Sequence, residues 1–259
     1  MYECYETPLF GFSVLFLDYE YAPETAIELQ HILENNGFFK DCFIQAGKLT
    51  HNRFVRLRED MREHFISAYT GACSVIQLCG AKNTTDTWSI CLTAFCPKTS
   101  QKPEQITKWN RVSLSVPYRL LKEALFCDRF FASFFQLLSL LKPFYATLDD
   151  LAVSSELSSY PGKGFIVPTR YGVVKAIHWG NYFSSAYCEK YKLSPQTHLP
   201  AAHMKSIGDG IYFSITESPL DYDTPQCMAQ REEIASILNI SLEEAMVGLH
   251  YFGLPGNNR

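Results

Sequence analysis

The fold is predicted chiefly from two segments, residues 177–187 (I-H-W-G-N-Y-F-S-S-A-Y) and residues 208–225 (G-D-G-I-Y-F-S-I-T-E-S-P-L-D-Y-D-T-P). The first segment belongs to an extended region that we expect at residues 173–184, and the second contains a strand that begins at Asp209. Side chains alternate between the two faces of a strand, and here one face is entirely apolar. Ile211, Phe213 and Ile215 share that face, and Tyr212, Ser214 and Thr216 share the other.

A helix is predicted shortly after this strand, because proline is favoured in the first turn of a helix and Pro225 follows the polar turn. Asp223 or Thr224 is expected to cap this helix, which should run through Leu238. A capping box predicts one more helix at residues 242–249. The inward positions of the first of these helices are expected to be Met228, Ile234, Ala235 and Leu238.

The first hundred residues predict an alternation of strands and helices. The first strand is apolar on both faces, as a central strand is, and the helix after it begins at Pro23 and stops before Gly37. Residues 53–69 predict an amphipathic helix, whose charged face we interpret as solvated, with partner binding as the alternative. Strands are expected at residues 10–18, 41–46, 74–79 and 86–95, and the last two should form a hairpin.

A polar linker with two prolines, residues 97–108, is the best candidate for an internal boundary. After it, apolar residues alternate with serines at 112–116, which predicts a half-buried strand. Asp128 is expected to cap an apolar helix at 130–141, which Lys142 and Pro143 stop. That apolar run is too short for a membrane span and is predicted to be a core helix.

These elements predict the α+β class, with an antiparallel or mixed sheet and helices packed mainly on one side. Two α/β halves are expected, residues 1–100 and 101–259, each of which is a candidate sheet-and-helix unit. We expect the halves to be similar in kind and to pack as one compact molecule.

The composition excludes some classes of protein. The 259 residues are 47% hydrophobic and 19% charged, as in ordinary globular chains. The formal net charge of −4 disfavours a nucleic-acid binder, because such proteins usually carry an excess of Lys and Arg. No Lys or Arg precedes Lys40, so a secretory signal is not expected, and no apolar run approaches a membrane span. We therefore expect a cytoplasmic protein that binds neither nucleic acid nor membrane.

The sequence carries no recognisable motif for catalysis, metal binding or a cofactor. A phosphate-binding loop, a dinucleotide fingerprint and a G-x-S-x-G elbow are all missing from it. Its nine cysteines lack C-x-x-C spacing and are interpreted as reduced, buried residues, with a redox or metal role as the alternative. Cys188 with His178 is one of many conceivable nucleophilic pairs. We predict no catalytic residue, no metal and no cofactor.

Three carboxylates, Glu217, Asp221 and Asp223, lie close together before Pro225 and allow three interpretations. The segment is the capped entry to the helix, or an acidic and aromatic recognition loop for a basic protein, or a divalent-cation site. The spacing lacks the regular pattern of a calcium loop, which leaves the cation site least favoured. The cap and the recognition loop are compatible with each other.

Three segments together resemble the immunity proteins that accompany toxins of the type VI secretion system (T6SS). The first is V-S-L-S-V-P-Y followed by the apolar run F-F-A-S-F-F-Q-L-L-S-L-L-K-P-F-Y-A, and the second is H-W-G-N-Y-F-S. The third is residues 208–225, followed by a helix with Ala229, Ile234 and Leu238 in family-like spacing. The resemblance covers roughly residues 110–240, and the cysteine-rich N-terminal half departs from it.

The resemblance implies a cytoplasmic antidote, not an enzyme, that binds a cognate antibacterial toxin domain and occludes its active site. A basic toxin surface would suit the acidic loop, since carboxylates can stand in for a phosphate-rich substrate. The candidate partner-binding residues are Glu217, Asp221, Tyr222 and Asp223, with Trp179 and Tyr182 as weaker candidates. Trp179 is expected equally in the core. The alternative hypotheses are a Cys- or metal-dependent hydrolase of unknown substrate and an adaptor that inhibits nothing.

Overall fold

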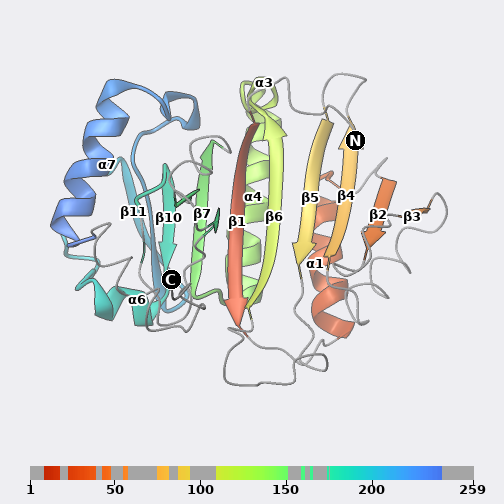
Figure 1. Ribbon diagram of the computed structural model, residues 1–259, viewed down its shortest axis with the longest axis horizontal. Helices are drawn as coiled ribbons and strands as arrows, with labels where there is room; N and C mark the ends of the chain where they lie inside the picture. The colour runs from red at the N-terminus through yellow and green to blue at the C-terminus, as the bar shows by residue number, and fades with distance from the viewer. Residues whose placement is uncertain are drawn as a thin grey trace, which may run out of the picture. The chain divides into compact units, whose positions relative to one another are not determined.

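The computed structural model describes residues 9–17, 23–38, 43–47, 55–57, 75–81, 87–93, 109–150, 159–160, 164–165, 174 and 176–240 (Figure 1). The described residues up to Pro143 form one compact unit, and those from Phe144 onward form a second. The structural division therefore falls some forty residues after the boundary expected at residues 100 and 101. The reason is that the strand at 109–117 pairs with two strands of the N-terminal segment and stays with them.

The first unit is an antiparallel sheet in which the strand after the linker is inserted between strands that precede it. β6 (Trp109–Pro117) lies between β1 (Leu9–Leu17) and β5 (Thr87–Thr93). The order continues through β4 (Val75–Ala81) and β2 (Phe43–Gly47) to β3 (Val55–Leu57). β1 is buried on both faces over most of its length, as its two apolar faces predicted.

Two helices, α1 (Pro23–Asn35) and α4 (Ala124–Leu141), cover the same face of this sheet (Figure 1). Phe12 of β1 packs against Phe130 and Phe134 of α4, with ring centroids 5.3 and 5.4 Å apart. The end of α1 reaches α4 through a hydrogen bond of 3.0 Å from Asn36 Nδ2 to Gln136 Oε1. These contacts make one face of α4 part of the core, as predicted, and support the α+β class.

α4 is longer than the sequence predicted. It begins at Ala124, after the short helix α3 (Tyr118–Leu121), and Glu123 stands at its N-cap. Asp128 therefore lies within the helix and does not cap it, because the residues before Phe130 are themselves helical. The predicted end is confirmed, since Lys142 takes a left-handed conformation with φ of 42°. By length and composition alone α4 is long and apolar enough to cross a membrane, a test that core helices of soluble proteins pass as well.

A strand, and not a helix, lies near the start of the helix expected at residues 53–69. Val55–Leu57 forms β3, which pairs with β2, so helix is wrong for these residues. The partner, β2, is the strand that directly precedes β3 in the chain, and the helical spacing of the apolar residues in 53–69 concealed this antiparallel pairing. The rest of that segment, like the helix expected at 242–249, lies outside the described residues.

The second unit contains four antiparallel strands that pair in the order β7, β10, β12, β11. These strands are β7 (Tyr145–Asp150), β10 (Gly180–Phe183), β12 (Gly210–Ser214) and β11 (His203–Ile207). Two further short strands, β8 (Ser159–Tyr160) and β9 (Gly164–Phe165), pair with each other. The helices are α6 (Ser185–Lys190), the 3-10 turn η2 (Pro219–Asp221) and α7 (Pro225–Ile237).

The glycines of the two segments quoted first are explained by close packing. A Cβ on Gly210 would overlap the Phe183 carbonyl oxygen, and one on Gly180 would lie 2.8 Å from Leu148 Cδ1. Gly208 instead has φ of +59° at the first central position of the β11–β12 turn, where glycine is favoured. All five residues of β12 are buried, so both of its predicted faces are covered.

The sequence analysis missed two elements of this unit and predicted a third to be longer than it is. No element was predicted for the residues of β11 or α6, and among its described residues the extended region expected at 173–184 contains a strand only at Gly180–Phe183. α7 begins at Pro225 as predicted and ends at Ile237, one residue before the predicted end. Ile234 and Leu238 are buried as predicted, but Ala235 is only half-buried and Met228 is 40% exposed. The buried stripe of α7 is instead made by Cys227, Arg231, Ile234 and Leu238.

Candidate functional site

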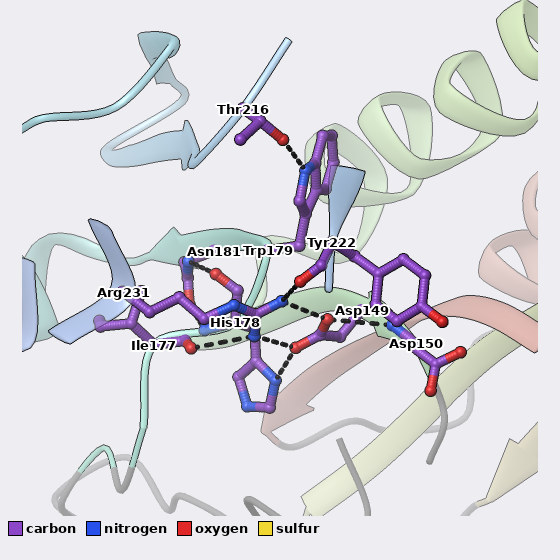
Figure 2. A network of polar contacts seen from close by, with 9 residues as sticks. All are labelled: Asp149, Asp150, Ile177, His178, Trp179, Asn181, Thr216, Tyr222 and Arg231. Atoms are coloured by element: carbon purple, nitrogen blue, oxygen red, sulfur yellow. Dashed lines mark hydrogen bonds and ion pairs between the residues drawn. The ribbon is translucent and has the colours of Figure 1, made fainter. Parts of the chain in front are cut away.

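The most distinctive feature of the second unit is a buried ion pair between β7 and α7 (Figure 2). Asp149 is 2% exposed and Arg231 is 4% exposed. The guanidinium contacts both carboxylate oxygens, with 2.6 Å from NH1 to Oδ2 and 2.8 Å from NH2 to Oδ1. Such a two-pronged contact is the strongest geometry that these two groups offer each other.

Further hydrogen bonds complete the environment of this carboxylate. Asp150 donates its backbone N–H to Asp149 Oδ1 over 3.0 Å, and His178 Nδ1 lies 3.1 Å from Oδ2. His178 is itself held by Asn181, whose amide accepts from the backbone N–H of His178 at 3.0 Å and donates to its carbonyl at 2.8 Å. Both oxygens of Asp149 are thus occupied, so the group is built to hold charge and not to accept a substrate proton.

The pKa values of the cluster agree with a permanent ion pair. Burial raises the pKa of Asp149, but the hydrogen bonds from Arg231 and His178 outweigh it and bring the pKa below its ordinary value. Burial lowers the pKa of Arg231, and the bonds to Asp149 outweigh this and raise it. For the neighbouring Cys227 thiol, burial is the largest effect and leaves the pKa raised despite the nearby guanidinium.

The acidic loop, defined here as residues 217–224, joins β12 to α7. Glu217 and Asp223 are exposed, whereas Asp221 and Tyr222 are half-buried. Glu217 Oε2 lies 2.7 Å from Nε2 of His203, an exposed residue at the start of β11. Thr224 accepts a hydrogen bond of 3.2 Å from the backbone N–H of Cys227, which confirms the predicted helix cap. The capped helix entry and an exposed acidic surface therefore coexist in one loop.

Trp179 and Tyr182 do not belong to this surface. Each is 2% exposed, so both are core residues, and their assignment as partner-binding candidates is corrected accordingly. Trp179 Nε1 donates to Thr216 Oγ1 over 2.7 Å, and the Tyr182 hydroxyl lies 3.4 Å from the Ile207 carbonyl in the β11–β12 hairpin. Their polar ends are satisfied inside the protein, which is why two amphipathic aromatic residues can be buried here.

Sequence reasoning did not identify Asp149 or Arg231. One signal was available: Cys227, Arg231, Ile234 and Leu238 follow the spacing of a single helix face, which places the arginine among buried residues. A charged residue on an apolar face requires a buried partner. Nothing in the local pattern around Asp149, 82 residues earlier, indicates that it is this partner.

The nucleophilic pair considered from the sequence is not assembled. His178 contacts Asp149, while Cys188 donates to the Phe183 carbonyl at 3.3 Å, and burial raises the pKa of the Cys188 thiol to about 11. Within the described part of the chain, no group of three or more His, Cys, Asp or Glu side chains is arranged to hold a metal ion.

Comparison with known proteins gives a likeness in fold. No protein-family model matches the chain, and no curated protein sequence is significantly similar to it. Among solved structures, the Pseudomonas aeruginosa T6SS protein PA0821 is similar, with a TM-score of 0.59 and 13% sequence identity. The alignment covers 91% of this chain and 74% of that protein. At this low identity the likeness shows a shared fold and nothing further.

Proposed function

We propose that this protein is a cytoplasmic immunity protein that binds a cognate T6SS toxin and occludes its active site. The observation that carries the proposal is the likeness in fold to a T6SS protein over 91% of the chain. The sequence resemblance to immunity proteins over roughly residues 110–240 points in the same direction. The protein acts as a binder and not as an enzyme.

The acidic loop is the surface that we assign to the toxin. It presents the exposed carboxylates of Glu217 and Asp223 beside the half-buried Asp221 and Tyr222. A cluster of carboxylates steers a basic partner toward it and competes with a phosphate-rich substrate for the same cleft. Tyr222 adds an aromatic contact of the kind that is frequent at the centre of protein interfaces.

For the alternative, a Cys- or metal-dependent hydrolase, the three cysteines whose side chains are described give no support. Cys127, Cys188 and Cys227 all have a raised pKa, for which burial is the largest cause. A nucleophilic cysteine requires the opposite shift, because the thiolate is the reactive form.

The test is co-expression with the product of the adjacent gene. We expect relief of that product's toxicity and a stable one-to-one complex in isothermal titration calorimetry. Replacing Glu217 and Asp223 by Lys should weaken binding by about 100-fold, since two attractive contacts become repulsive. A control with the same change of charge, Glu232→Lys with Glu233→Lys on the exposed face of α7, should stay within about two-fold. Absence of a complex together with unrelieved toxicity would refute the proposal.

A further inference from the structure

One guanidinium joins three separate segments of the second unit (Figure 2). Besides its bonds to Asp149 on β7, Arg231 donates from NH2 to the Tyr222 carbonyl over 3.2 Å. Its NH1 lies 3.4 Å from the Ile177 carbonyl, just before β10. The Tyr222 carbonyl belongs to the acidic loop, so the loop is connected to the buried carboxylate through a single side chain.

The acidic loop is also held at both of its ends. At its entry, the Trp179 indole donates to Thr216 Oγ1 over 2.7 Å, and this hydroxyl donates to the Ser218 carbonyl over 2.9 Å. At its exit, the Thr224 hydroxyl donates to the Asp221 carbonyl over 2.9 Å. Between these two points, the hydrogen bond from Arg231 NH2 reaches the Tyr222 carbonyl from the core.

We propose that Arg231 is a positioning residue, which holds the acidic loop in one conformation by linking the Tyr222 carbonyl to the buried carboxylate of Asp149. This inference rests on the proposed function for its purpose, since it explains how the toxin-binding surface is kept in shape. A loop that is already ordered loses less conformational entropy on binding, and the toxin is then bound more tightly.

The chemistry of the side chain makes arginine specific for this task. Its planar fork of donors reaches both oxygens of Asp149 and still has a donor left for the Tyr222 carbonyl. The lysine ammonium is a compact charge without this fork. An Arg231→Lys variant is therefore expected to keep the charge near Asp149 and to lose the link to the loop.

Hydrogen exchange of loop amides tests the inference without any toxin. The N–H groups of Leu220, Asp221 and Thr224 are bonded to Ser218 Oγ, the Ser218 carbonyl and the Asp221 carbonyl. In Arg231→Lys we expect these three amides to exchange at least about ten-fold faster, which corresponds to about 1.4 kcal/mol. The matched control is Ile234→Val, three residues along the same helix and fully buried, which should accelerate only globally exchanging amides.

A second variant covers the case in which Arg231→Lys does not fold. The double change Asp149→Leu with Arg231→Met leaves no buried charge unpaired and should remain folded, yet it lacks the donor to Tyr222. The same three amides should again exchange about ten-fold faster. The inference would be overturned if the loop amides of the folded variant, either Arg231→Lys or the double variant, exchange no faster than those of Ile234→Val.

Toxin binding separates this inference from the proposed function. If the adjacent gene product binds, Arg231→Lys should weaken it about ten-fold although no toxin-facing carboxylate has changed. If no complex forms with the unaltered protein, the proposed function fails while the exchange result still decides the role of Arg231. Faster loop exchange with unchanged toxin affinity would show that the link orders the loop without serving recognition, and would overturn the purpose that we assign to it.

Discussion

Asp149→Asn is expected to destabilise the second unit by about 3–5 kcal/mol, although the side chain keeps its shape. The substitution leaves Arg231, which is 4% exposed, as a buried charge without a counter-ion. Two charge-assisted hydrogen bonds, of 2.6 and 2.8 Å, are weakened at the same time. Such bonds contribute about 1.5–3 kcal/mol each, which agrees with the cost of about 3–5 kcal/mol for breaking a buried pair.

The assay is urea unfolding followed by tryptophan fluorescence. The chain has three Trp residues, and Trp179 is the one that lies after Phe144, in the second unit. In a Trp88→Phe, Trp109→Phe background, the signal therefore reports unfolding of the second unit alone. The free energy of unfolding is compared between Asp149 and its variants in that same background.

A double-variant cycle gives the refuting result. Asp149→Leu with Arg231→Met removes both charges and should recover most of the lost stability, because replacing a buried ion pair by apolar residues is often neutral. A loss below about 1 kcal/mol for Asp149→Asn would mean that water reaches the pair. If the double variant loses as much stability as the Asp149→Leu and Arg231→Met single variants added together, the ion pair has no coupling energy.

The remaining predictions concern pH, glycine and capping. The folded pKa of Asp149 lies below its ordinary value of 3.8, so its contribution to stability is complete above pH 3.8 and is lost as the pH falls through the folded pKa. Urea midpoints measured from about pH 6 to pH 2 should show this loss of stability. The Asp149→Asn variant should not show it. Gly210→Ala should lower the free energy of unfolding by about 1–3 kcal/mol, because the new Cβ would overlap the Phe183 carbonyl. Gly208→Ala has no atom within 4 Å of the new Cβ and should lower it by about 1–2 kcal/mol through the positive φ alone, and Gly208→Asn by less. Equal losses for Gly210→Ala and Gly208→Asn would contradict this account. Thr224→Ala should lower the free energy of unfolding by about 1 kcal/mol through loss of the bond to the Cys227 amide, and Thr224→Ser should restore it.

The elements that the sequence predicted well are those that local patterns determine. A run that is apolar on both faces predicted β1, and the alternation of apolar residues with serines predicted β6. The ends of α1 were predicted from Pro23 and Gly37. α7 followed from Pro225 and the threonine cap. Each of these signals lies within a few residues of the structure it specifies, so tertiary contacts were not needed to find it.

Other features depend on contacts that no local pattern contains. β11 is a sheet-edge strand whose residues are mostly exposed, so its sequence H-M-K-S-I shows no apolar alternation. Trp179 was an ambiguous candidate until its hydrogen bond to Thr216 placed it in the core. Asp149 looks like a surface charge in sequence, and only its contact with Arg231 in the folded chain shows why it is buried. The carboxylates of the acidic loop, by contrast, are exposed or half-buried, and their role in binding stays a prediction.

The separation of 82 residues between Asp149 and Arg231 has a consequence for synthesis on the ribosome. At about 5–20 residues per second, the carboxylate is made about 4–16 s before the guanidinium that pairs with it. During that interval, burying β7 would enclose an uncompensated negative charge, so the nascent sheet gains little by closing. Packing of the second unit should therefore wait for α7, and a nascent chain stalled before Arg231 should remain open to protease in this unit while the first unit is already protected.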